Sequence, residues 1–345
     1  MGMLHRFAVF VAASTVVLLL AGGLVTSTGS GLAVPDWPTT YGQNMFTFPP
    51  SKWVGGIFYE HGHRLIASTV GFLTIILAAW LWRADSRRWM KRLGAAALGA
   101  VVLQGALGGL TVLFFLPAAI STAHAGLAEI FFCMTVAIAL FTSPGWTRPW
   151  QPVDDDSLRR LATATTVIIY LQILVGAVMR HTGAGLAIPD FPLMFGRIVP
   201  DHWDAGIAVH FAHRVGALAV TASVVATCAH VWSPRARRVL GSDWSALSRP
   251  AILIAGLVLV QITLGALTVL TARAVWINSL HLVCGALVLA TSVVITLRSW
   301  RARFTDVVVD TDRVEVASRA GFAQPVLHDT GGTTVDQTDP NGIHA

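Results

Sequence analysis

The sequence predicts an all-α integral membrane protein, with eight transmembrane helices arranged as two parallel-repeat four-helix bundles. Composition is the first reason, because 54% of the residues are hydrophobic and only 12% are charged, whereas soluble domains contain roughly 25% charged residues. The second reason is an internal repeat, since TGSGLAVPDWP at 28–38 returns as TGAGLAIPDFP at 182–192. A repeat of this kind indicates two copies of one architecture.

Eight stretches are long and apolar enough to cross a bilayer, which requires about 20 mainly apolar residues. They lie near residues 8–27, 64–83, 94–116, 122–142, 160–179, 207–231, 251–271 and 278–298. The first is longer than the apolar region of a signal peptide, about 7 to 15 residues, and its repeat partner lies inside the chain. It is therefore predicted to be a structural helix.

Each half contains an even number of predicted helices, so both halves enter the membrane from the same side and the repeats are parallel. Further matched segments are GHRL at 62–65 with AHRV at 212–215, LQGALGGLTVL at 103–113 with VQITLGALTVL at 260–270, and STAHAG at 121–126 with NSLHLV at 278–283. We divide the chain into an N-terminal bundle at 1–150, a C-terminal bundle at 151–303 and a tail at 304–345. The tail lacks an apolar span, and we expect it to be disordered.

Arginine and lysine residues gather on one side of the predicted membrane. They follow the even-numbered predicted helices, as at Arg87, Arg148, Arg237 and Arg301. Positively charged short loops remain in the cytoplasm, so both termini and the tail are expected there, with the PDWP and PDFP segments on the outer face. The net charge of +6 then reflects membrane topology, and we expect no nucleic-acid partner.

The cysteines Cys133, Cys228 and Cys284 all fall inside predicted helices. A buried thiol usually behaves as a small hydrophobic group. We therefore expect free thiols and no structural disulfide.

Each half carries two matched histidines near the outer face: His63 and His124 in the first half, His213 and His281 in the second. His63 and His213 are predicted to open their helices, and His124 and His281 to lie in first turns. A single intramembrane histidine often serves as an interhelical contact, but four at repeated positions favour ligands. Two imidazoles are too few for a typical zinc site, whereas two suffice for axial binding of haem iron. The pattern predicts a haem between facing helices of each half.

The halves diverge where EHGHR at 60–64 aligns with HFAHR at 210–214, so that Glu60 aligns with His210. Glu60 precedes His63 by one helical turn and shares its face, where a carboxylate can accept protons. The alternative is a solvated glutamate that interacts with the helix dipole. His210 either orients the haem pocket by hydrogen bonding or replaces His213 as the ligand.

Other polar residues near the predicted sites are less specific. Arg64 and Arg214 either pair with haem propionates or extend to lipid headgroups. Glu129 is a secondary carboxylate candidate that lies off the face of His124. We expect the unmatched His61 and His181 near the surface, and His202 in a loop, without assigned roles.

The set of ExxHR at 60–64, HAG at 124–126, HxxHR at 210–214, His281 and TGSGLAVPDWP resembles the haem A synthase family over roughly residues 5–300. The resemblance implies an oxidoreductase acting on a CH group, which converts the C8 methyl of haem O to the formyl of haem A for cytochrome c oxidase. It implies haem O near His63 and His124, a cofactor haem b held by His213 and His281, and Glu60 as the catalytic carboxylate. Implied partners are haem O synthase and cytochrome oxidase assembly factors, in a bacterial plasma membrane.

One departure from the family pattern concerns cysteines. Some members carry a cysteine pair in the first outer loop, whereas this chain has none between residues 28 and 60. A mechanism that requires such a disulfide is not expected here, and electrons must leave by another route.

Two other functions use the same histidines. A dihaem membrane electron carrier of the quinol-oxidising type would hold two unmodified haems and would not need Glu60. A histidine-based metal or solute transporter would bind its cargo without a Soret band. Whether haem is bound at all, and whether haem O is converted to haem A, therefore distinguish the three functions.

Overall fold

The computed structural model describes residues 2–148, 155–241 and 244–301. In this part of the chain the regular secondary structure is helical, and eight helices are long and apolar enough to span a membrane, which confirms the predicted class. They are α1 Met3–Ser27, α2 Gly56–Ala84, α3 Arg88–Leu113, α4 Ala118–Phe141, α6 Asp156–His181, α7 Ala205–Trp232, α9 Trp244–Leu270 and α10 Val275–Ser299. Short helices are η1 Pro50–Lys52, α5 Pro144–Thr147, η2 Ala184–Leu186 and α8 Pro234–Leu240. The predicted division at 150/151 and the predicted tail at 304–345 lie outside the described residues.

Most helices begin before the apolar stretches that predicted them. α2 begins at Gly56 and α7 at Ala205, so the prediction that His63 and His213 open their helices is wrong. His124 and His281 likewise lie in second rather than first turns. Hydropathy detects only the apolar part of a span, whereas the hydrogen-bonded helix continues through polar interfacial residues because its backbone groups remain satisfied internally. The histidines are therefore held within regular helix.

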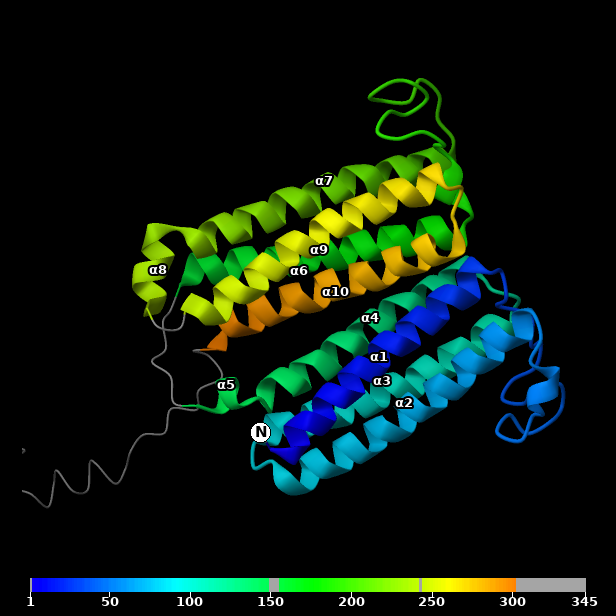
Figure 1. Cartoon of the computed structure of the whole chain (residues 1–345), viewed down its shortest axis with the longest axis horizontal. Coiled ribbons are helices and arrows are strands. Elements are labelled where there is room, and N and C mark those ends of the chain that lie inside the picture. Colours follow the sequence, from blue (N-terminus) through cyan, green and yellow to red (C-terminus); the bar gives the residue numbers. More distant parts are fainter. Residues whose placement is uncertain (1, 149–154, 242–243, 302–345) are drawn as a thin grey trace, which may run out of the picture. The chain divides into compact units, whose positions relative to one another are not determined.

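The long helices pack in two closed groups of four (Figure 1). In the first group α1 contacts α2 and α4, and α3 contacts α2 and α4; in the second, α6 contacts α7 and α10, and α9 contacts α7 and α10. The groups meet where α10 contacts α1 and α4, and where α4 contacts α6. α4 and α10 are the most buried spans, and small buried residues such as Gly126, Ala286 and Ala290 allow this close approach.

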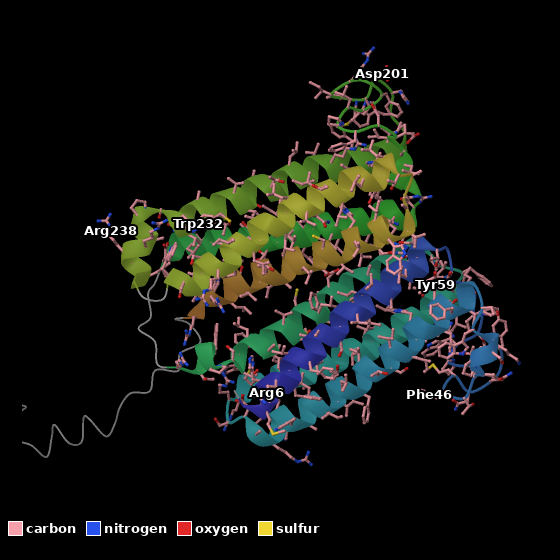
Figure 2. All side chains as sticks on the ribbon, in the orientation of Figure 1. Arg6, Phe46, Tyr59, Asp201, Trp232 and Arg238 are labelled. Carbon is pink, nitrogen blue, oxygen red and sulfur yellow. The ribbon has the colours of Figure 1, made fainter. Side chains whose placement is uncertain are left out.

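The two loops that carry the repeated PDWP and PDFP segments lie at the same end of the helices, opposite α5 and α8 (Figure 1). Side chains drawn in Figure 2 place Phe46 and Asp201 at this end and Arg6 and Arg238 at the other. The loops are therefore on the side that the distribution of basic residues predicts to be the outer one.

The cysteines of the described chain are free. Cys228 and Cys284 are buried and Cys133 is partly buried. The sulfhydryl groups of Cys228 and Cys284 each donate to a helix carbonyl, of Ala251 and Leu257 respectively. The prediction of free thiols without a disulfide is confirmed for these residues.

Candidate haem-binding site

Each of the four matched histidines packs against a glycine on the neighbouring helix. The pairs are His63 with Gly22, His124 with Gly108, His213 with Gly176, and His281 with Gly265. A Cβ atom on these glycines would lie 3.1, 3.2, 2.9 and 3.0 Å, respectively, from the ring Cε1 atom, closer than ordinary van der Waals contact. The glycines therefore make room for the imidazoles.

The second half brings His213 of α7 and His281 of α10 together. Their ring centroids lie 6.5 Å apart, with an angle of 71° between the ring planes. Two imidazoles that bind one metal ion from opposite sides, each at about 2.0 Å, have centroids about 6 Å apart. The observed separation is close to this value.

The donor set also suits a group that needs few protein ligands. Within the described residues, no cluster of three or more His, Cys, Asp or Glu side chains could hold a metal ion. The Nδ1 atoms of His63, His124 and His281 are buried without a hydrogen-bond partner in that part of the chain. Buried nitrogens of this kind are consistent with imidazoles that are completed by a bound group.

Three glutamines approach the histidines, and the sequence interpretation missed all of them. Gln104 donates to the carbonyl of His124 at 2.9 Å, and its Nε2 lies 3.4 Å from the Nε2 of that ring. Gln261 lies 3.5 Å from Nε2 of His281. Gln172 of α6 donates to the carbonyl of His213 at 2.7 Å, and its Nε2 lies 3.0 Å from ring Nδ1. Gln104 and Gln261 occupy matched positions in the repeat, a signal that could have identified them.

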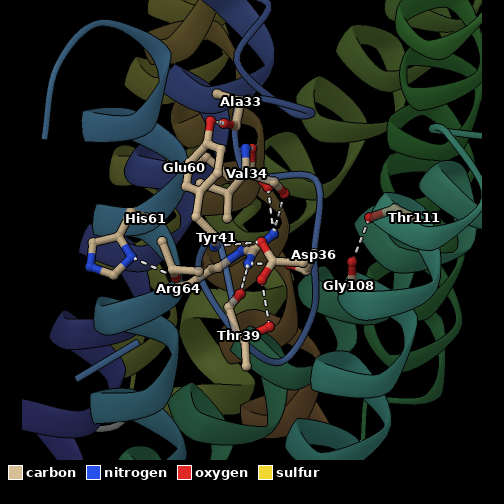
Figure 3. A network of polar contacts seen from close by, with 11 residues as sticks. Ala33, Val34, Asp36, Thr39, Tyr41, Glu60, His61, Arg64, Gly108 and Thr111 are labelled. Carbon is tan, nitrogen blue, oxygen red and sulfur yellow. Dashed lines mark hydrogen bonds and ion pairs between the residues drawn. The ribbon is translucent and has the colours of Figure 1, made fainter. Parts of the chain in front are cut away.

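Glu60 is buried beneath the first outer loop, with 3% of its surface exposed. Its Oε2 accepts the Val34 N–H at 2.7 Å, and its Oε1 pairs with Nη2 of Arg64 at 2.7 Å. Figure 3 shows this network from close by. The alternative of a solvated glutamate at the helix entry is therefore wrong, because the loop folds over the start of α2.

Arg64 holds the same loop by hydrogen bonds. Its guanidinium donates to the carbonyl oxygens of Val34, Asp36 and Thr39 at 2.9, 2.7 and 3.0 Å. The sequence suggested that Arg64 pairs with propionates or contacts lipid headgroups. These hydrogen bonds to loop carbonyls belong to neither role. The first-half arginine thus holds the loop that covers Glu60.

The second half repeats this arrangement with an imidazole in place of the carboxylate. His210 is 2% exposed, and its Nδ1 accepts the N–H of Ile188 at 3.2 Å. Arg214 donates to the carbonyls of Ile188, Asp190 and Leu193 at 3.1, 2.7 and 3.0 Å. Glu60 and His210 therefore hold equivalent places on equivalent loops.

The two repeated loops and the four matched histidines all lie within the part of the chain that matches a known family. The family model described as cytochrome oxidase assembly protein matches residues 5–293. The chain belongs to the cytochrome oxidase assembly protein family. Relatives with the name haem A synthase include those of Halalkalibacterium halodurans, 31% identical over 286 residues, which are 81% of this chain and 92% of the relative, and of Symbiobacterium thermophilum, 32% identical over 266 residues, 74% of this chain and 83% of the relative. The relative from Shouchella clausii is 31% identical over 244 residues, 69% of this chain and 79% of its own.

In this member of the cytochrome oxidase assembly protein family, His61 departs from expectation. It is completely buried, and its Nδ1 lies 3.1 Å from the Thr40 hydroxyl. The rings of Phe48 and Trp53 lie 5.1 and 4.7 Å from its ring. The expected surface position is wrong because residues of the long first loop return over α2, a contact that the sequence does not indicate.

The remaining polar candidates lie elsewhere in this family member. Glu129 is buried in α4, and its Oε2 has no hydrogen-bond partner within the described chain. His181 ends α6 and is partly buried, whereas His202 is an exposed loop residue paired with Asp201 at 2.9 Å, as expected for a loop position. None of these three is held in the Glu60 network.

Proposed function

We propose that the protein is a haem A synthase, which oxidises the C8 methyl group of haem O to the formyl group of haem A. Haem O binds in the first half between His63 and His124, and a resident haem b binds in the second half between His213 and His281. Membership of the family and relatives of that name over most of the chain support this assignment.

The observation that carries the proposal is the exchange of Glu60 for His210 at one scaffold position. Both side chains accept the N–H of an equivalent loop residue, Val34 or Ile188. Both precede a histidine-arginine pair by the same spacing. The scaffold is thus duplicated, and at this position the first half has a carboxylate capable of proton transfer where the second half has an imidazole, as expected if only the first half performs chemistry.

Oxidation of a methyl to a formyl group removes electrons and protons from one carbon and adds oxygen. A haem b in the second half would supply an electron acceptor next to the substrate half. Glu60 would accept protons, and the Arg64 guanidinium beside it compensates the carboxylate charge in a buried setting. The loop held by Arg64 keeps water away from the carboxylate, because Val34 and Glu60 are both buried.

We also propose a location and an orientation for the protein in the cell. The chain spans a bacterial plasma membrane with both termini in the cytoplasm and the haem sites near the outer face, since basic residues gather at the end opposite the repeated loops. Haem O synthase and cytochrome oxidase assembly factors are the corresponding partners for substrate supply and product use.

The test is pigment extraction from protein purified from cells that make haem O, with haems b, O and A separated by chromatography. Wild type should contain haem A. Glu60→Ala should lower the formation of haem A by at least 100-fold while haem b remains, because a general base contributes about 10²- to 10⁴-fold to rate. His63→Ala should also lower it, because haem O loses a protein ligand. Asp201→Asn, a change at an exposed outer-loop carboxylate, is the matched control and should leave the yield unchanged.

Two results would contradict the proposal. Wild type that contains only haem b, with no change in Glu60→Ala, would favour a dihaem electron carrier. Purified protein without a Soret band, after expression with haem O and haem b available, would favour a transporter.

A further inference from the structure

The two halves differ at a second pair of positions beside the histidines. Gln172 precedes the histidine-contacting Gly176 by four residues, as Leu18 precedes Gly22. Gly216 follows His213 by three residues, as Ile66 follows His63. The second half therefore has a glutamine and a glycine where the first half has a leucine and an isoleucine.

Gln172 and Gly216 depend on one another sterically. A Cβ atom on Gly216 would lie 1.9 Å from Oε1 of Gln172, a distance that excludes any side chain there while the glutamine keeps its conformation. Gly216 thus admits the amide to the ring of His213. The equivalent first-half residue, Ile66, carries a side chain at this position and is partly buried.

The two halves therefore also differ in the amide contacts of their histidines. Nε2 of Gln172 lies 3.0 Å from Nδ1 of His213, and glutamine amides approach a ring nitrogen of His124 and of His281 at 3.4 and 3.5 Å. Among the described residues, His63 is the one matched histidine without such an amide, and its Nδ1 is buried and unpartnered. His63 is therefore the least fixed of the four.

Outer-shell partners of a metal-binding imidazole fix its orientation, and loss of such a partner typically costs 10- to 100-fold in metal affinity. Nε2 of Gln172, an N–H donor, is the atom that approaches Nδ1, whereas Oε1 of the same amide faces Gly216. The carbonyl of His213 accepts from the same amide at 2.7 Å. The amide thus holds both the ring and the backbone of this residue.

We propose that Gln172 is a positioning residue that makes the second half retain its haem, and that the absence of its equivalent beside His63 lets the first half exchange substrate for product. The inference rests on the proposed function, because only a synthase needs one permanent and one exchangeable haem. Retention of haem is thus assigned to the pair Gln172–Gly216, and exchange of haem to the pair Leu18–Ile66.

The direct test removes the hydrogen bond and keeps the volume. In Gln172→Met the side chain has similar length but no amide. We measure the rate of haem b transfer from the purified, haem-loaded protein to apomyoglobin, and the reduction potential and ferric EPR spectrum of the haem that remains. Transfer should accelerate about 10- to 100-fold, with a shifted potential and EPR signal. Gln172→Glu keeps the shape of the side chain but has no amide N–H to donate, so it should accelerate transfer as well.

Exchange of the pairs between halves tests the same idea in both directions. The double variant Gln172→Leu/Gly216→Ile should release haem b quickly, and Leu18→Gln/Ile66→Gly should slow the release of haem from the first half. Leu171→Ala is the matched control, because Leu171 is the preceding residue on α6 and is 53% exposed. Its haem transfer and EPR spectrum should equal those of wild type.

Unchanged transfer rate, potential and EPR spectrum in Gln172→Met would overturn the inference, even if the double variants failed to fold. The conversion of haem O to haem A by wild type is measured in the same preparations. Absence of haem A from wild type would reject the proposed function, whereas haem A formation together with normal haem b retention in Gln172→Met would reject this inference alone.

Discussion

Asp36 and Asp190, the acidic residues of the PDWP and PDFP segments, close equivalent turns. Asp36 accepts the N–H groups of Tyr41 and Gly42 at 2.7 and 2.8 Å, and Asp190 those of Phe195 and Gly196 at 2.8 and 2.9 Å. Gly42 and Gly196 have φ values of 73° and 75°, a region in which glycine is unstrained. The sequence identified these segments as repeats, and the structure gives the aspartates their role.

These turns should open in acid. Burial raises the pKa of Asp36, but hydrogen bonds from Gly42, Thr39 and Tyr41 outweigh this effect and hold the pKa below its usual value of 3.8. Because the folded pKa is lowered, the stabilisation is complete above about pH 3.8 and is lost as pH falls through the folded pKa. Hydrogen exchange, corrected for its intrinsic pH dependence, should show faster exchange of the Tyr41 and Gly42 amides only in that acidic range.

Asp36→Ala should produce the open turn at neutral pH, with the local opening free energy reduced by about 1 to 3 kcal/mol because charge-assisted hydrogen bonds are lost. Asp201→Ala, at an exposed carboxylate, should leave these amides unchanged. Protection of Tyr41 and Gly42 that does not respond to Asp36→Ala would show that the carboxylate does not close the turn.

At the scale of the helices, the contact that a glycine makes depends on what the neighbouring helix places opposite it. Gly176 of α6 faces the ring of His213, whereas a Cβ atom on Gly256 of α9 would have no described atom within 4 Å. Both are glycines within spans, and hydropathy does not distinguish them. Only the neighbouring helix decides which one has a specific partner.

The two glycines should respond oppositely to alanine. Gly256→Ala should raise the free energy of unfolding by up to about 1 kcal/mol, because alanine is the better helix former. Gly176→Ala places a Cβ atom 2.9 Å from Cε1 of His213, so the ring must shift and the haem b content per protein should fall by at least half. Thermal unfolding and pyridine haemochrome assays measure the two effects. Equal haem content in both variants would contradict the contact.

At the scale of the whole molecule, a polar cluster joins the two halves near the loop end of the helices. Ser27 of α1 accepts from Arg180 of α6 at 2.8 Å and from Asn278 of α10 at 3.2 Å, and its hydroxyl lies 2.9 Å from that of Ser279. Arg180 also donates to the carbonyl of Gly23 at 3.0 Å. This cluster joins α1 to two helices of the other half.

Loss of the Ser27 hydroxyl should therefore loosen the junction. Ser27→Ala removes three hydrogen bonds, and intramembrane bonds average about 0.6 kcal/mol each, so unfolding in sodium dodecyl sulfate should become easier by about 1 to 2 kcal/mol. Thr69→Ala is the control, because its exposed hydroxyl donates only to the Leu65 carbonyl of its own helix. Equal stabilities of the two variants would mean that the cluster does not join the halves.

Local features of the sequence were sufficient for the membrane class, the eight spans and the choice of four histidines. Apolar length alone decides whether a helix can cross a bilayer, and the repetition of matched segments selects His63, His124, His213 and His281. The helix starts were predicted too late, because hydropathy does not detect polar interfacial turns.

Tertiary structure alone decided which partners those residues meet. The bond from Val34 to Glu60 spans 26 residues and that between Gln172 and His213 spans 41, so neither is visible in local spacing. His61 became a buried residue for the same reason, since the first loop folds back over α2. Composition and repetition thus determined which side chains enter the membrane, and the packing of distant loops and helices determined how each half holds its histidines.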